Sequence, residues 1–192
     1  MLGYAMCGSF CNLKAAINQL RILSQSGEDI LPIMSQNAYD TDTKFGNAKD
    51  FIDEVETICG KKIIKEIREA EPIGPQIYLD CLCIAPCTGN TLAKLSHGIC
   101  DTSVTMAAKA HLRNERPLVL ALASNDVLSL NAPSLAIMLQ RKNVYIVPIG
   151  QDDAVKKPRS AVCRFELIGE TIKEARQGKQ IQPILWCDGF CY

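Results

Sequence analysis

Two short stretches of the sequence are rich in small polar residues, and each lies between an apolar run and the start of a helical pattern. Residues 7–10 read Cys-Gly-Ser-Phe, and residues 87–91 read Cys-Thr-Gly-Asn-Thr. Hydroxyls, carboxamides and the free N–H groups of a helix start bind anions, so these stretches predict a phosphate site. Ser35 ends a third apolar run in the same way. The residues expected to bind a phosphate-bearing cofactor are Gly8, Ser9, Ser35, Thr88, Gly89, Asn90 and Thr91.

The same residue types also favour helix N-caps and tight turns, so each stretch by itself has a purely structural interpretation. Three such stretches at the ends of three apolar runs favour a ligand instead. The dinucleotide fingerprint Gly-x-Gly-x-x-Gly is absent, which favours a mononucleotide over NAD.

The charge balance bounds the partners of this 192-residue chain. Lys plus Arg and Asp plus Glu each number 21, so the net charge is zero. Nucleic-acid binding needs a basic surface, which this composition does not supply. Weak net charge favours self-association, so we expect a homo-oligomer. We find no secretory signal and no apolar stretch near the ~20 residues of a membrane span, and we expect a cytoplasmic protein.

Ten cysteines raise the alternatives of disulfides or zinc. Cys81 and Cys83 lie inside an apolar run, and no Cys-x-x-Cys pair is present, so we expect reduced, buried thiols and no metal site. The closing residues 186–192 read WCDGFCY. We interpret them as an irregular tail, with a reactive thiol pair as the alternative.

Apolar runs and amphipathic patterns alternate along the chain, which predicts a doubly wound α/β fold: a parallel sheet of five or six strands between two helical layers. One domain should cover 1–192, with a tail over about 178–192. Ligands of such sheets bind beyond the carboxyl ends of the strands, where the polar stretches lie. The predicted strands are 2–6, 30–34, 79–85, 118–123 and 144–149. The predicted helices are 12–26, 48–58, 62–70, 88–97, 104–113, 132–141 and 161–176.

Three segments resemble the flavoprotein family of flavin-containing cysteine decarboxylases and flavin prenyltransferases. They are CGSF at 7–10, PCTGNTLAKLSHGICD at 86–101 and ALASNDV at 121–127. The resemblance implies a Rossmann-like flavoprotein fold that binds FMN at the strand ends and assembles as a trimer or dodecamer. It adds Phe10, Pro86 and Asp101 to the cofactor-binding residues.

Longer strings, spread over nearly the whole chain, resemble the B subunits of dipicolinate synthases from spore-forming bacteria. They are FGNAKDF, AEPIGP, LDCLCIAPCTGN, MAAKAHLRNERPLVL, SNDVLSLN, PIGQDDAVKKP and QPIL. This resemblance implies oxidation of dihydrodipicolinate, or of its hydroxytetrahydro precursor, to dipicolinate during sporulation, in the mother-cell cytoplasm. It also implies a separate A subunit that carries a nicotinamide cofactor.

The sequence departs from the decarboxylase pattern at two places. Alignment of the strand that ends in Ala85-Pro86 puts Pro72 at the position of the family's catalytic His. Proline cannot transfer a proton, so we expect no cysteine decarboxylation. In the family's Pro-x-Met-Asn substrate motif, Asn125 stands for the Asn, but Leu122 and Ser124 replace the Pro and the Met.

No strong general base is evident, and the catalytic candidates are Asn125, Asp126 and Cys87. We expect His97 to cap helix carbonyls and His111 to lie on a solvated helix face.

A planar dicarboxylate needs cationic anchors, for which Lys156, Lys157 and Arg159 form the best cluster, with a solvated loop as the alternative. Arg113 and Arg116 are second choices. Two further functions stay open: a non-catalytic partner of the dehydrogenase subunit and, less favoured, a flavin prenyltransferase.

Overall fold

A seven-stranded sheet forms the centre of the protein, whose structure, a computed structural model, describes residues 1–186. The strand order is β2-β1-β3-β4-β7-β6, and β5 also pairs with β4. Strands β1 to β5 run parallel, whereas β7 pairs antiparallel with both β4 and β6. The strands are β1 (Leu2–Met6), β2 (Ile30–Met34), β3 (Cys81–Cys87), β4 (Leu118–Ser124), β5 (Val144–Ile146), β6 (Ile149–Gly150) and β7 (Ala161–Cys163).

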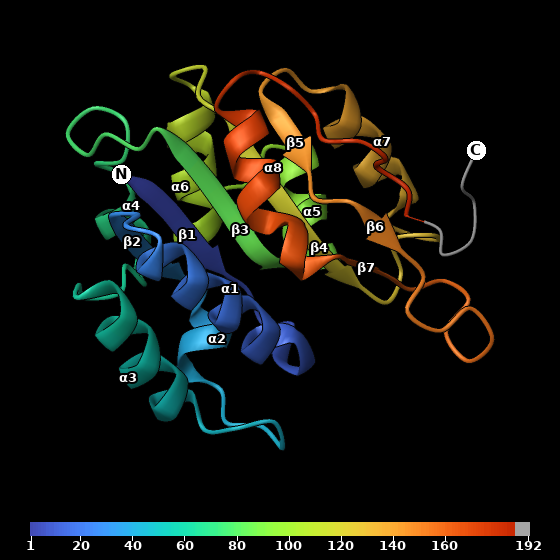
Figure 1. Cartoon of the computed structure of the whole chain (residues 1–192), viewed down its shortest axis with the longest axis horizontal. Helices are drawn as coiled ribbons and strands as arrows, with labels where there is room; N and C mark the ends of the chain where they lie inside the picture. The colour runs from blue at the N-terminus through green and yellow to red at the C-terminus, as the bar shows by residue number, and fades with distance from the viewer. Residues whose placement is uncertain (187–192) are drawn as a thin grey trace.

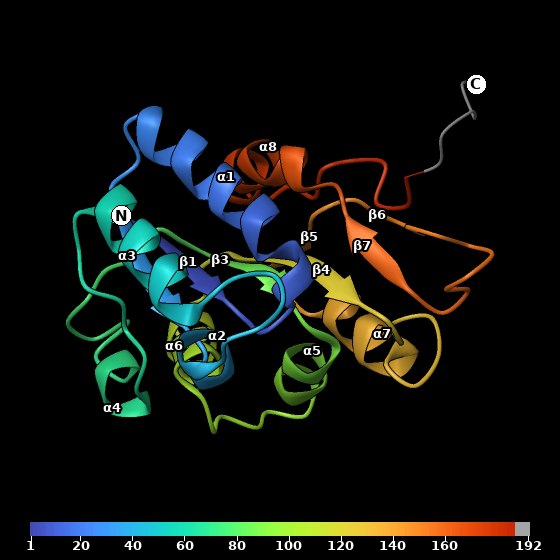
Figure 2. The ribbon, with the colours of Figure 1, turned by 90° about the horizontal axis from the view of Figure 1, so that it is seen from below.

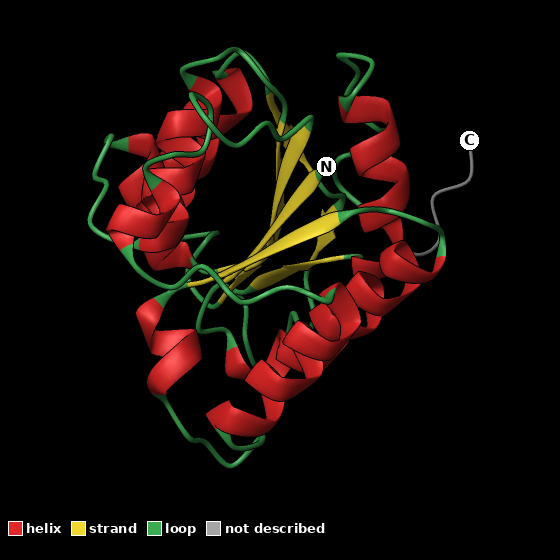
Figure 3. Ribbon diagram, turned by 90° about the vertical axis from the view of Figure 1, so that its left-hand side faces the viewer, coloured by secondary structure: helices red, strands yellow, loops and turns green. Residues whose placement is uncertain are grey.

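Helices cover both faces of this sheet (Figures 1 and 2). On one face α1 and α8 pack together against β1, β3 and β4, and on the other α5 and α6 pack against β4. The three layers are visible edge-on in Figure 3. The helices are η1 (Phe10–Asn12), α1 (Leu13–Gln25), α2 (Gln36–Asp40), α3 (Ala48–Cys59), α4 (Ile67–Ala70), α5 (Gly89–Ser96), α6 (Ser103–Leu112), α7 (Ala132–Gln140), η2 (Phe165–Leu167) and α8 (Ile168–Ala175).

The central strands are buried along their whole length because helices cover both of their faces. Every residue of β1, β3 and β4 is buried, which explains their uninterrupted apolar sequences. The predicted fold class is therefore confirmed. The carboxyl ends of these strands meet at one edge of the sheet, and the turns that follow them lie there.

The last third of the sheet differs from the prediction. The expected strand 144–149 is divided into β5 and β6. Val147 still donates its N–H to Leu120 O in β4 (N···O 3.0 Å), but Pro148 has no N–H to donate and interrupts the strand. The expected helix 161–176 is wrong at its start, where Ala161–Cys163 pairs with Ala123 and Ser124 as β7. This edge of the sheet is therefore mixed, and the strands outnumber the five or six expected.

The expected helix 62–70 is reduced to α4 at its end. Residues 62–65 instead lie along the outer edge of β2. Ile64 donates its N–H to Pro32 O (3.0 Å), and Met34 donates to Ile64 O (2.9 Å). β-Branched Ile63 and Ile64 favour this extended pairing, which satisfies an otherwise open sheet edge.

Four cysteines of the sheet are buried, free thiols: Cys81, Cys83, Cys87 and Cys163. Cys187 and Cys191 lie outside the described residues. The expected capping role of His97 is confirmed, since its Nδ1 lies 2.9 Å from Ala93 O in the last turn of α5. His111 does not lie on a solvated face: it is fully buried, with Nε2 2.9 Å from Pro117 O.

The residues from Met1 to Trp186 contain no group of three or more His, Cys, Asp or Glu side chains placed to hold a metal ion. None of their helices has the length and apolar character needed to cross a membrane.

Candidate functional site

A cavity of about 720 Å³ opens at the carboxyl edge of β1, β3 and β4. Four segments contribute to it: the turn after β1, the start of α5, the exit of β4 and the β6–β7 hairpin with its loop. Phe45, from the loop before α3, also lines it. The lining residues are Gly8, Ser9, Phe10, Cys11, Asn12, Phe45, Thr88, Gly89, Asn90, Ala123, Ser124, Asn125, Asp126, Asp152, Lys157, Ser160 and Val162.

Many residues singled out in the sequence meet in this cavity. They are Gly8, Ser9, Phe10, Thr88, Gly89, Asn90, Asn125, Asp126 and Lys157. Others proposed for the site do not line it: Ser35, Pro86, Cys87, Thr91, Asp101, Lys156 and Arg159. Sequence reasoning missed Phe45, Asp152 and Ser160, which reach the cavity from distant loops. The only sequence signal for Phe45 was its place in one of the matching strings.

The turn after β1 has a conformation set by its own hydrogen bonds. Cys7 donates its N–H to Pro86 O (3.2 Å), which joins the ends of β1 and β3. Ser9 donates its N–H to Cys7 O (2.8 Å), and its hydroxyl accepts from Asn12 Nδ2 (3.0 Å). Within the described part of the chain, the amides of Gly8 and Phe10 have no partner. These two N–H groups are available to an anion.

The surroundings of residue 8 do not require a glycine there. The φ of Gly8 lies outside the left-handed region that favours glycine, and an added Cβ would meet only the Phe10 ring at 3.4 Å and Asn37 Cβ at 3.5 Å. A methyl group therefore fits, and it would occupy space at the cavity wall.

The start of α5 is held by a chain of hydroxyls. The Thr88 hydroxyl accepts from the Thr91 N–H (3.2 Å) and donates to the Thr91 hydroxyl (3.1 Å). Thr91 in turn donates to Cys7 Sγ (3.2 Å), so it connects α5 to β1 from beneath the cavity. Among the described residues, the amides of Gly89 and Asn90 have no partner. The start of a helix carries such unpaired N–H groups and a partial positive charge.

Asp126 lies against this helix start. Its Oδ1 accepts from the Ser124 hydroxyl (2.6 Å), and its Oδ2 accepts from Asn131 Nδ2 (2.7 Å). Both oxygens are therefore engaged, and a negative charge is fixed beside the positive end of α5. These two donors hold the carboxylate in place, so it can position the turn.

Cys87 and Cys7 are also unsuited to acid–base work. Burial raises the pKa of the Cys87 thiol well above its usual value, and burial raises the pKa of Cys7 to about 11. Both thiols stay protonated at neutral pH.

The hairpin side of the cavity carries an ion pair. Lys157 Nζ lies 2.8 Å from Asp152 Oδ2. The hydrogen bond to Asp152 raises the pKa of Lys157, and the same bond lowers the pKa of Asp152. Among the described lining residues Lys157 is the one cation, and Asp126 and Asp152 are anions. A ligand with several negative charges would therefore depend on backbone amides as well as on Lys157.

The remaining predicted residues have other contacts. Ser35 caps α2 by accepting from the Ala38 N–H (3.4 Å). Asp101 forms an ion pair with Lys94 (2.8 Å). Pro72 lies in a turn, and its carbonyl oxygen accepts from the N–H groups of Gln76 and Ile77 (3.0 Å each). Lys156 and Arg159 are exposed on the same loop, one on either side of Lys157 in the sequence.

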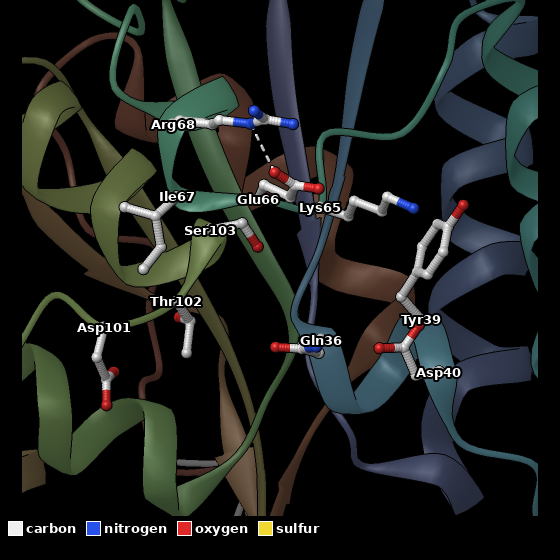
Figure 4. A pocket seen from close by; sticks show the side chains of 10 residues that line it. All are labelled: Gln36, Tyr39, Asp40, Lys65, Glu66, Ile67, Arg68, Asp101, Thr102 and Ser103. Atoms are coloured by element: carbon white, nitrogen blue, oxygen red, sulfur yellow. Dashed lines mark ion pairs between the residues drawn. The ribbon is translucent and has the colours of Figure 1, made fainter.

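Asp101 lines a second cavity, of about 460 Å³, between α2, α4 and the start of α6 (Figure 4). Charges of both signs surround it, and they are paired locally. Lys65 Nζ lies 4.4 Å from the centre of the Tyr39 ring, and Arg68 pairs with Glu66 at 2.6 Å. The charged groups of this cavity therefore favour no ligand of one sign.

Comparison with known proteins agrees with this architecture. The model of the Flavoprotein family matches residues 2–155, so β7 and α8 lie beyond the match. The chain is 40% identical over 184 residues to the dipicolinate synthase B subunit of Bacillus subtilis (strain 168), covering 96% of this chain and 92% of that protein.

Solved structures also resemble this chain in fold. The crystal structure of the dipicolinate synthase B subunit from Bacillus halodurans C is 38% identical, with a TM-score of 0.89, and the match covers 96% of this chain and 95% of that one. The FMN-dependent cysteine decarboxylase SpaF shares the fold at 20% identity, with a TM-score of 0.66 and coverage of 91% and 95%. The resemblance seen in the sequence is confirmed, and the chain belongs to the Flavoprotein family.

Proposed function

We propose that this chain serves as the B subunit of a dipicolinate synthase and that the cavity at the carboxyl edge of β1, β3 and β4 binds FMN. The observation that carries the proposal is the meeting of the turn after β1 with the start of α5 around one cavity, where unpaired amides and hydroxyls from both segments are available. Its volume of about 720 Å³ suits a cofactor, since such sites span about 300–1,000 Å³.

The charges in the cavity suggest which residues hold which part of the cofactor. Asp126 already lies at the start of α5, where it opposes a second anion. The phosphate therefore belongs at the turn after β1, on the amides of Gly8 and Phe10 and the hydroxyl of Ser9. The carboxamides of Asn90 and Asn125 suit the hydrogen-bonding edge of an uncharged ring.

Bound FMN supplies a hydride acceptor for oxidation of dihydrodipicolinate or of its hydroxytetrahydro precursor. The chain's own residues bind and orient both molecules. Phe10, Phe45 and Val162 offer apolar contacts at the cavity wall. Lys157, with Lys156 and Arg159 on the same loop, is proposed to bind the substrate's carboxylates. Because both Asp126 oxygens already accept a hydrogen bond and Cys87 stays protonated, water is proposed as the proton acceptor.

The assembly follows from the same proposal. A dehydrogenase A subunit with its nicotinamide cofactor is the partner, and copies of this chain associate as a trimer or dodecamer. Sporulation in the mother-cell cytoplasm is the setting. These statements rest on the resemblance to dipicolinate synthase B subunits.

The test is an FMN titration followed by flavin fluorescence and by visible absorbance. We expect wild-type protein to take up FMN at micromolar concentration. Gly8→Ala should weaken uptake at least tenfold, since the methyl group stands where the phosphate approaches. Gly169→Ala is the matched control, because its added Cβ also has room, with Leu23 Cδ2 at 3.7 Å, far from the cavity. Colourless wild-type protein, or full uptake by Gly8→Ala, would contradict the flavin site.

A second function is favoured by the state of the two carboxylates among the described lining residues: each Asp126 oxygen already accepts one hydrogen bond, and Asp152 is paired with Lys157. The chain would then be a non-catalytic partner that activates the A subunit. Dipicolinate formation by the A subunit, measured alone, with wild-type chain and with Gly8→Ala, separates the two. Equal stimulation by Gly8→Ala and wild type supports the non-catalytic partner, and stimulation by wild type alone supports the flavin enzyme. A flavin prenyltransferase is less favoured, because the cavity has no basic cluster for a second phosphate among its described lining residues.

A further inference from the structure

The β6–β7 hairpin and its loop form one wall of the proposed FMN cavity through Asp152, Lys157, Ser160 and Val162. The backbone pairing of this wall with the rest of the sheet is short. β7 pairs with β4 at two positions, Ala123 with Val162 and Ser124 with Ala161. Leu128 also donates its N–H to Arg159 O (3.1 Å). Two short strands of this kind are marginally stable without further support.

That support comes from residues 184–186, which we call the C-terminal strap. Ile149 in β6 donates its N–H to Ile184 O (2.8 Å), and Trp186 donates its N–H to Ile149 O (2.7 Å). The strap therefore lies along the outer side of β6 as a further, parallel strand. It satisfies backbone groups that an edge strand would otherwise leave unpaired.

Trp186 also lies close to both strands of the hairpin. Its ring lies 4.7 Å from the Arg164 guanidinium, just after β7. Its carbonyl oxygen packs on Gly150 in β6, where an added Cβ would meet it at 3.2 Å. A planar cation is attracted to the face of an indole ring. The strap is thus held to the hairpin by its backbone and by one aromatic side chain.

The hairpin separates the FMN cavity from the strap. Asp152 and Val162 line the FMN cavity on one side of the hairpin. On the other side they line a different cavity, of about 450 Å³, together with Trp186 and Arg164. A movement of β6 therefore moves Asp152, and with it the Lys157 ammonium bound to its carboxylate.

We infer that the C-terminal strap positions the hairpin wall of the cavity, with Trp186 as a positioning residue that contacts neither cofactor nor substrate. The inference rests on the proposed function only for its effect on FMN. Its structural part concerns the hairpin alone and can be tested without flavin.

Hydrogen exchange of peptides from 151–160 tests the structural part. A chain that ends at Pro183 lacks the strap, and a chain that ends at Trp186 keeps it. We expect exchange at 151–160 to be at least fivefold faster in the shorter chain and unchanged in the longer one, with β1 and β3 unchanged in both. Trp186→Ala should have an intermediate effect. Leu185→Ala is the matched control, since that side chain is 72% exposed and its backbone pairing remains. Unchanged exchange at 151–160 in the shorter chain overturns the inference.

FMN titration of the same four proteins tests the consequence for the cavity. We expect the shorter chain and Trp186→Ala to bind FMN at least fivefold more weakly than the longer chain and Leu185→Ala. Weaker binding without faster hairpin exchange, or faster exchange with unchanged affinity, overturns the positioning role. A wild-type chain that takes up no FMN refutes the proposed function instead, and the exchange measurement still decides whether the strap holds the wall.

Discussion

Gly89 and Asp126 touch where two parallel strands end. A Cβ on Gly89 would lie 2.6 Å from Asp126 Oδ1, and also 2.6 Å from Ser124 Oγ. The backbone at the start of α5 therefore lies so close to the side chains at the exit of β4 that there is no room for a Cβ on residue 89. Glycine at this position is explained by packing, whereas glycine at position 8 is not. The two glycines of the cavity thus make opposite predictions.

Gly89→Ala should destabilise the fold. The new methyl group displaces the Asp126 carboxylate and the Asn131 carboxamide, whose Nδ2 lies 2.8 Å from the added Cβ. Overpacking of this kind costs about 1–3 kcal/mol. Urea unfolding measures it, and Gly8→Ala, which meets no contact closer than 3.4 Å, should stay within about 0.5 kcal/mol of wild type. Equal stability of the two variants would refute this explanation.

Asp126→Asn should also destabilise the fold. The carboxylate accepts from two donors, and an amide in its place turns an NH₂ group toward one of them. The loss of one such part-buried bond should cost about 1 kcal/mol, the lower end of the range for leaving a polar group unpaired. Asn125→Ala is the control, since that exposed side chain has no hydrogen-bond partner among the described residues. A general base at position 126 would instead show lost turnover with unchanged stability.

His111 should make stability depend on pH between 7 and 5. Burial lowers its pKa to about 4, so the folded protein keeps the ring neutral, while an unfolded chain protonates it near 6.5. The unfolded state therefore binds more protons as the pH falls below about 6.5, and stability decreases by roughly 1–2 kcal/mol by pH 5. His111→Gln should remove this decrease in urea unfolding. The exposed His97→Gln should keep it, and a pH-independent wild type would contradict the prediction.

Arg176 should stabilise the fold at neutral pH through two carboxylates at the amino end of the sheet. Its guanidinium forms two hydrogen bonds to Glu28 (2.6 and 2.8 Å) and contacts Asp80 Oδ1 (2.8 Å). The hydrogen bond to Arg176 lowers the pKa of Glu28. Burial acts to raise the pKa of Asp80, but its bonds to the amino terminus and to Arg176 lower it overall.

Because both folded-state pKa values lie below the unfolded ones, this stabilisation is present above about pH 4 and is lost as the pH falls further. Arg176→Met should cost about 1 kcal/mol at pH 7, a value discounted for the partial exposure of these groups, and less at pH 3.5. Lys142→Met is the control, since its pair with Glu115 is mostly exposed. An equal cost at both pH values would contradict the prediction.

Local patterns were enough to predict the central fold. The apolar runs 2–6 and 30–34 are strands with the expected ends, because every residue of the first and all but Leu31 of the second are buried within the layers of the fold. Of Thr88 and Asn90, the two residues expected as caps of this helix, Thr88 is the N-cap of α5, and such capping depends on residues only three apart in the chain. The turns after β1 and β3 were likewise identified from residue types that suit helix starts.

The tertiary structure alone decided what lines the cavity. The Ser35 hydroxyl caps α2 and does not line the cavity. Phe45 and Asp152 reach the cavity from loops whose course depends on distant contacts. Residues 161–163 form a strand because β4 offers them backbone partners, although their own pattern suits a helix. His111 is buried because α6 packs it against the chain just before β4. Sequence patterns express local preference and burial, whereas pairing and cavity lining are set by which segments the completed fold brings together.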